Sequence, residues 1–270
     1  RATACAAFLG SIALLGIALR DETAERRSLA LYAYGLNPVA LWSVAEGHND
    51  AFLLLAATAA FALARRRGAL LGSFALALGP LIKAPGLLFA LVYAIRVSWF
   101  ENQRARSTWI GAAAGTAVAA FLTIPPLFPA LTRLGTHGVY APAVSIQGLI
   151  GPVWAAIAAT ALLANAARML VRRDPRAFAW AGLAIVAALP HDYPWYALWL
   201  VPLALAAGPG PASAALWGAT IFALVRYLPD ATGNMSDTMA RAASAVAALP
   251  FALALADLRP SDRRKTTPPP

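Results

Sequence analysis

Apolar segments recur along the whole chain, and they constrain its fold more than any other feature. They fall at 4–19, 28–45, 51–64, 68–82, 84–99, 107–128, 150–171, 177–190, 194–207, 212–228 and 238–257. The sequence is 60% hydrophobic and 13% charged, whereas soluble domains are nearer half apolar and a quarter charged. Regular alternation of apolar and polar residues is absent, which argues against strands. The pattern predicts an all-α, polytopic integral membrane helix bundle with about eleven transmembrane segments.

The boundaries of this bundle follow from the same pattern. We expect one transmembrane helical domain over 1–258 and a disordered cytoplasmic tail over 259–270, because the tail is charged and then Pro-rich. Segments 51–64 and 68–82 are shorter than the ~20 residues of an untilted span, so they either include flanking residues or are partly re-entrant. The chain opens at Arg1 without a Met or a leader, and we expect that it begins part-way through a longer protein.

Basic residues occupy alternate connections between the segments. They are Arg20, Arg26 and Arg27; Arg65, Arg66 and Arg67; Arg96, Arg104 and Arg106; Arg168, Arg172, Arg173 and Arg176; and Arg259, Arg263, Arg264 and Lys265. Cytoplasmic connections of membrane proteins are enriched in Lys and Arg. These connections are therefore predicted to face the cytoplasm. The net charge of +10 then reflects membrane topology and not nucleic-acid binding.

The remaining connections are predicted to face outward, and they contain the unusual polar clusters. They lie at 46–50, 83–85, 129–149, 191–196 and 229–237, and all three histidines of the chain belong to them. One chemically rich face and one plainly basic face predict a site at the outer surface of the membrane.

The first cluster is "AEGHNDAF", which places Glu46, His48, Asn49 and Asp50 within five residues. A cap for the following helix would explain Asn49 or Asp50 alone. Ionisable groups at membrane depth are costly and usually functional, so we expect the four to bind sugar hydroxyls or a phosphate. Asn37, in the Asn-Pro pair that interrupts the preceding apolar run, is assigned to the same site.

Two further outward stretches complete the predicted site. Lys83 in "GPLIKAPG" lies between two prolines; it either snorkels to the interface or binds phosphate as a point charge. In "LPHDYPWYALWLVP", His191 and Asp192 precede Trp195, Tyr196 and Trp199. The rings fit an aromatic belt at the interface, which leaves His191 and Asp192 for a substrate head group.

Other kinds of site have no motif here. The sequence contains no P-loop, Rossmann glycine fingerprint, HExxH or GxSxG pattern. The three histidines have no paired spacing and Cys5 is the one cysteine, so neither a metal site nor an internal disulfide is indicated. We expect no cofactor.

Three stretches together resemble a known family. "YAYGLNPVALWSVAEGHNDAFLLLA", "GPLIKAPGLLFAL" and "HDYPWYALWLVPL" are similar to multi-pass C-type (GT-C) glycosyltransferases, above all to bacterial polyprenyl-phosphate-mannose-dependent mannosyltransferases. The likeness covers 28–202. It implies a bacterial plasma-membrane enzyme that transfers a sugar, with mannose the first candidate, from a polyprenyl-phosphate donor in the outer leaflet to a glycan or lipid-linked acceptor.

The resemblance also implies roles for the residues. Such enzymes carry an acidic catalytic base in their first outer loop, which has no equivalent here. The base therefore lies upstream of Arg1, or Glu46, Asp50 or Asp192 replaces it. That carboxylate would take the proton of the acceptor hydroxyl. Asn37, His48, Asn49, Lys83, His191, Trp195 and Tyr196 would bind substrate, with Lys83 stabilising the charge on the departing phosphate.

Two other classes remain open at this point. A secondary transporter or flippase would use Glu46, His48 and Asp50 for proton coupling, but it predicts inverted repeats, which this sequence does not display. A membrane scaffold would leave the four outward polar clusters unexplained.

Overall fold

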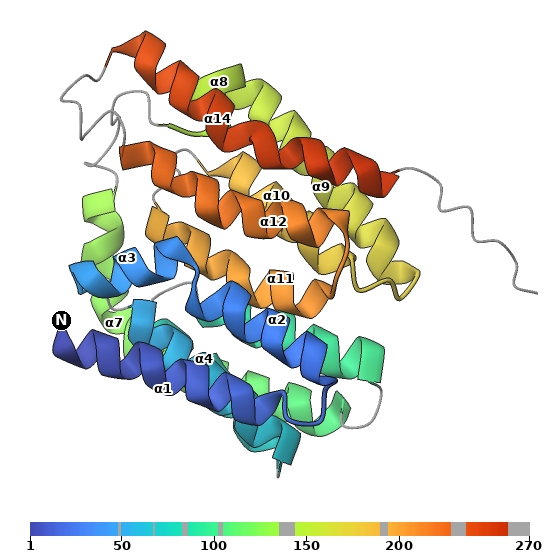
Figure 1. Cartoon of the computed structure of the whole chain (residues 1–270). Coiled ribbons are helices and arrows are strands. Elements are labelled where there is room, and N and C mark those ends of the chain that lie inside the picture. The colour runs from blue at the N-terminus through green and yellow to red at the C-terminus, as the bar shows by residue number, and fades with distance from the viewer. Residues whose placement is uncertain are drawn as a thin grey trace, which may run out of the picture.

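The computed structural model describes residues 1–47, 50–66, 68–82, 86–101, 105–134, 144–189, 194–227 and 236–258. In these ranges every regular element is helical, which confirms the all-α prediction (Figure 1). The elements are α1 (Ala2–Ala18), α2 (Ala24–Gly35), α3 (Pro38–Glu46), α4 (Asp50–Arg66), α5 (Ala69–Ala77), η1 (Gly79–Leu81), α6 (Gly86–Ile95), η2 (Arg96–Glu101), α7 (Ala105–Leu134), α8 (Ile146–Ile150), α9 (Pro152–Val171), α10 (Ala177–Ala188), η3 (Pro194–Leu200), α11 (Val201–Ala207), α12 (Pro211–Phe222), η4 (Ala223–Arg226), α14 (Asp237–Leu255) and η5 (Ala256–Leu258).

Each predicted apolar segment coincides with one helix or with two consecutive helices. The main correction concerns 28–45, which the sequence pattern treats as one run. The structure divides it into α2 and α3, because Asn37 caps α3 and Pro38 occupies its first turn. A proline there fits a helix start, where its missing N–H has no intrahelical role. The expected kink is therefore a complete break between two helices.

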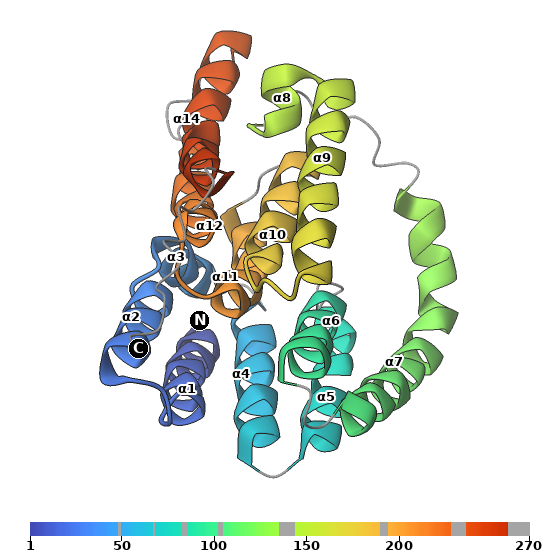
Figure 2. The same cartoon turned by 90° about the vertical axis from the view of Figure 1, so that its right-hand side faces the viewer.

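The helices run back and forth between two ends of the bundle (Figure 1, Figure 2). We call the end where α3 stops and α4 starts the site end; it also holds the end of α12 and the start of α14. The opposite end, the basic end, holds the α1–α2 and α9–α10 connections and the end of α14. The basic α1–α2 and α9–α10 connections thus lie at the opposite end of the molecule from the end of α3 and the start of α4.

Two large apolar clusters and a small third one form the core of the described residues, and η3 with α11 lies between the two large clusters. The first cluster joins residues of α1, α3, α4, α6 and η3, including Phe8, Leu53 and Leu198. The second joins α9, α10, α11 and α12, including Leu183 and Leu216. Because both clusters contact the 194–207 stretch, this stretch is held from both sides.

Small residues allow the closest helix pair to form. Helix α7 packs on α5 through Gly111 and Gly115, and a Cβ at Gly115 would lie 2.5 Å from the carbonyl oxygen of Phe74. A Cβ at Gly111 would collide with the carbonyl of Leu70. Interfaces of this small-residue kind are typical of helices that associate in membranes.

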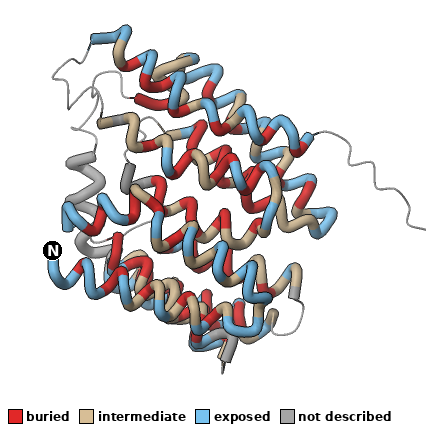
Figure 3. Tube along the Cα trace, in the orientation of Figure 1, coloured by how far each residue is buried: buried red, intermediate tan, exposed pale blue. Residues whose placement is uncertain are grey.

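The outside of the bundle is also apolar, and Figure 3 shows exposed residues along its outer helices. Large side chains that are between 63% and 79% exposed include Leu9, Leu29, Leu36, Phe121, Val153 and Val171. In the described part of the chain, two helices are long and apolar enough to cross a membrane, Pro152–Val171 and Asp237–Leu258. The remaining apolar helices are shorter, so helix length does not confirm the predicted eleven crossings.

Candidate functional site

Asn37 is buried between α2 and α3, and all of its described contacts are internal. Its Oδ1 accepts hydrogen bonds from the backbone N–H groups of Val39 at 3.0 Å and Ala40 at 3.2 Å. Its Nδ2 donates to Thr220 Oγ1 at 2.8 Å, which ties α3 to α12. Through these bonds Asn37 caps α3 and links it to α12. The predicted substrate contact of Asn37 has no support in this geometry and stays a prediction.

Glu46 and Asp50 lie on either side of the α3–α4 connection but differ in burial. Glu46 is exposed at the last position of α3. Gly47 then ends the helix at φ +80°, a left-handed conformation that glycine adopts without steric cost. Asp50 begins α4 and is 1% exposed. Of these two carboxylates, Asp50 is therefore buried inside the bundle and Glu46 lies at its surface.

Asp50 joins the two polar clusters that the sequence predicts. The indole Nε1 of Trp199, in η3, donates to Asp50 Oδ1 at 3.2 Å across 149 positions of sequence. Because η3 is held between the two core clusters, the indole supports the carboxylate from a fixed element. Sequence reasoning assigned Trp199 to an aromatic belt; its pairing with Asp50 had no signal in the linear pattern.

Several predicted residues lie outside the described part of the chain. These are His48, Asn49, Lys83, His191 and Asp192. Trp195 and Tyr196 belong to η3, but the structure describes only their backbone. Their predicted roles stay predictions.

The backbone on both sides of Lys83 is nevertheless well defined. Gly79 and Gly86 approach so closely that a Cβ at Gly86 would lie 2.6 Å from the Cα of Gly79. Only residues without side chains permit this approach. The two ends of the described backbone around Lys83, η1 and the start of α6, are therefore held together at these glycines.

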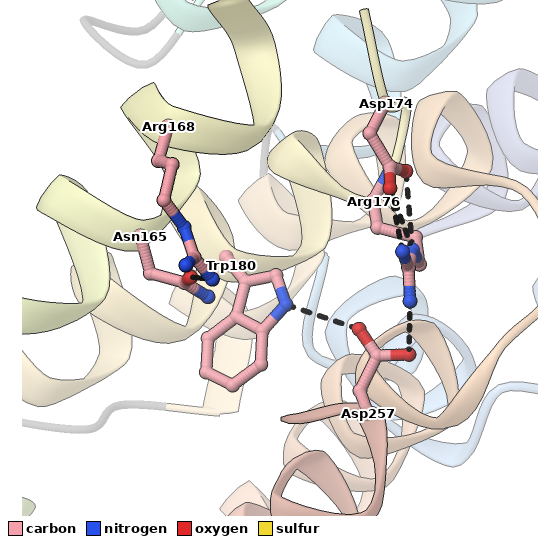
Figure 4. Close-up of polar contacts among 6 residues, drawn as sticks. All are labelled: Asn165, Arg168, Asp174, Arg176, Trp180 and Asp257. Atoms are coloured by element: carbon pink, nitrogen blue, oxygen red, sulfur yellow. Dashed lines mark hydrogen bonds and ion pairs between the residues drawn. The ribbon is translucent and has the colours of Figure 1, made fainter. Parts of the chain in front are cut away.

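A second polar network, which sequence reasoning missed, lies at the basic end (Figure 4). Arg176 contacts Asp174 Oδ2 at 2.6 Å and donates through Nη1 to Asp257 Oδ1 at 3.1 Å. Trp180 Nε1 donates to Asp257 Oδ2 at 3.1 Å. The hydrogen bond to Asp174, followed by that to Asp257, raises the pKa of Arg176 above its ordinary value. The network ties η5, which directly follows α14, to the start of α10.

The described residues contain no group of three or more His, Cys, Asp or Glu side chains that could hold a metal ion. The described polar groups at the site end instead suit hydrogen bonding and proton transfer.

No protein-family model matches the sequence, and no curated protein or solved structure matches it either. The function is therefore inferred from the chain's own residues and their geometry.

Proposed function

We propose that the chain is an integral membrane glycosyltransferase that moves a sugar from a polyprenyl-phosphate donor to an acceptor hydroxyl at the site end. The observation that carries the proposal is the hydrogen bond from Trp199 to Asp50. It unites the 46–50 and 189–202 stretches, the two that contribute most to the resemblance to C-type glycosyltransferases. Mannose is the first candidate for the transferred sugar.

The surface of the bundle supports a multi-pass arrangement with about eleven crossings. Soluble monomers rarely expose extended apolar surface, whereas α1 carries apolar residues on its exposed face, including Leu9 and Ile17. Broken helices such as α2 with α3 are tolerated at membrane depth where protein surrounds the break. Asn37, at that break, is 3% exposed. We propose that the site end faces outward, because the basic connections belong to the other end.

In the proposed reaction Asp50 is the general base. The acceptor oxygen forms a bond to the anomeric carbon while the bond from that carbon to the phosphate oxygen breaks. The bonding electrons leave with the polyprenyl phosphate, and the acceptor proton passes to the Asp50 carboxylate. Trp199 holds this carboxylate in one orientation, and Lys83 stabilises the charge that develops on the leaving phosphate.

The test is transfer from radiolabelled polyprenyl-phosphate-mannose in membranes that contain the protein, with an alkyl mannoside as acceptor. Asp50→Asn and Lys83→Ala are compared with Asp21→Asn, a matched control because Asp21 is an exposed surface carboxylate. We expect loss of transfer in the first two variants at normal protein levels and full transfer in the control. Full activity in both site variants would refute the assigned roles.

A secondary transporter or flippase is the second candidate, since buried carboxylates such as Asp50 also couple proton movement to transport. It predicts proton-driven uptake of a polar solute into proteoliposomes and no transfer product. Absence of transfer in the wild type together with such uptake would favour the transporter.

A further inference from the structure

Ser43 differs from the other buried hydroxyl residues of the bundle. It lies on the buried face of α3 and is 1% exposed. Its Oγ makes no hydrogen bond within the described part of the chain. Buried polar groups almost always have a partner, so each exception calls for an explanation.

A serine in a helix often donates to the backbone carbonyl four residues earlier, but Ser43 does not. Ser73, Ser98 and Ser244 each donate to the carbonyl four residues earlier, a common arrangement in membrane helices. The corresponding carbonyl for Ser43 is that of Val39. Because this bond is not made, the buried hydroxyl retains its capacity to donate to another group.

The surroundings of Ser43 belong to the candidate site. Helix α3 packs against η3, which carries Trp199, and against α4, which begins at Asp50. Ser43 shares the buried face of α3 with Val39 and Val44, which pack in one apolar cluster with Ala51 of α4 and Leu198 of η3. Ala51 and Leu198 are the sequence neighbours of Asp50 and Trp199.

We infer that the Ser43 hydroxyl binds a hydroxyl group of the sugar acceptor beside Asp50. This inference rests on the proposed function. A serine hydroxyl both donates and accepts, which matches a sugar hydroxyl, whereas a phosphate is recognised mainly by cations and N–H groups. In the proposed reaction Asp50 takes its proton from the acceptor. A hydroxyl on the face of α3 that packs with the neighbours of Asp50 and Trp199 is therefore assigned to the acceptor and not to the lipid phosphate.

Kinetics with each substrate varied separately test this assignment. Ser43→Ala is expected to raise the KM for the alkyl mannoside acceptor about 3- to 10-fold, the effect of one uncharged hydrogen bond. The KM for polyprenyl-phosphate-mannose stays unchanged. The Tm stays equal or rises, because the substitution removes a buried group that has no partner in the free protein. Ser98→Ala, whose hydroxyl bonds its own helix, is the matched control and leaves both KM values unchanged.

The outcomes separate this inference from the proposed function. Transfer in the wild type with unchanged kinetics in Ser43→Ala would overturn the role of Ser43 alone. A Ser43→Ala protein with a lower Tm would instead indicate a structural hydroxyl and would also overturn it.

If the wild type transfers no sugar, a second measurement tests whether the acceptor binds at position 43. A Cys5→Ser, Ser43→Cys protein contains one cysteine, because Cys5 is the single cysteine of the chain. A small water-soluble thiol reagent is expected to label Cys at position 43, and the alkyl mannoside to slow this labelling at least threefold. Labelling that the mannoside does not slow, or no labelling at all, would overturn the acceptor site.

Discussion

Two buried aspartates, one at each end of the bundle, accept a hydrogen bond from a tryptophan indole, yet their surroundings differ. Asp257 also accepts from Arg176, so both of its carboxylate oxygens are engaged. Arg176 also donates to Asp174, so the three charged side chains form one network. For Asp50 the described bond comes from a neutral indole, and the residue lies beside the connection with the most polar sequence.

This difference indicates that the two aspartate–tryptophan pairs have different roles, one in stability and one in activity. A buried carboxylate paired with an arginine holds elements together, because removing either partner leaves an uncompensated charge. The indole N–H of Trp199 orients the carboxylate of Asp50, which the proposed mechanism uses as the proton acceptor. We therefore expect changes at the basic end to alter stability and changes at the site end to alter activity.

The largest expected effect is that of Asp50→Asn on transfer. Loss of a general base lowers the rate about 100- to 10,000-fold. The amide oxygen still accepts from the Trp199 indole, so this contact is retained and the fall in Tm is expected to be smaller than that of Asp257→Asn. Initial rates and thermal unfolding in detergent check both parts. A rate loss below tenfold, or a large fall in Tm, would remove the contrast with Asp257.

Asp257→Asn is expected to show the opposite result. The amide can accept at one oxygen only, so either Arg176 or Trp180 loses its acceptor in a site where the Asp257 side chain is 3% exposed. We expect a loss of about 2–3 kcal/mol, which corresponds to a fall in Tm of roughly 5–10 °C. Transfer per folded molecule should be retained. Normal stability with lost transfer would contradict the structural role of this network.

Replacing each indole sharpens the comparison, because Phe retains the ring but not the N–H donor. Trp180→Phe is expected to cost about 1.5–2 kcal/mol and to leave transfer unchanged. Trp199→Phe is expected to lower transfer about tenfold with a smaller change in Tm, because the base loses its fixed orientation. Unfolding curves and initial rates of the two variants, measured side by side, decide this. Equal losses of stability and equal losses of transfer rate in the two variants would mean that both indoles have the same role.

The smallest effect concerns Arg176→Lys. Lysine cannot bridge two carboxylates with a planar fork, so we expect a loss of about 1 kcal/mol at pH 7. The pKa of Arg176 is raised in the folded protein. Its contribution is therefore complete below the pKa of the unfolded guanidinium and is lost only as the pH rises through the raised pKa of the folded state. Lysine loses its charge nearer pH 10.4, so the difference in Tm should widen from pH 7 to pH 10.5. A constant difference would show that the charge of residue 176 does not stabilise the fold.

The positions of the helices were predictable because each needs an apolar stretch of sufficient length. The break at Asn37 and Pro38 carried its own local signal, since Asn before Pro is a typical helix start. The pairing of Asp50 with Trp199 carried no such signal, because 149 residues separate the two. Asp257 was missed because its partners are also distant in the sequence. It also lies next to a tail that shows no packing pattern.

The linear pattern of apolar runs and basic connections by itself determined the helical class of this chain and the two opposite sets of connections. Hydrophobicity and charge act locally, so they can be read along the sequence. The tertiary structure alone decided that Asp257 accepts from both Arg176 and Trp180, and that Asp50 accepts from Trp199. It also decided that the hydroxyl of Ser43 has no described partner. Those properties depend on contacts between distant helices, and only packing brings these together.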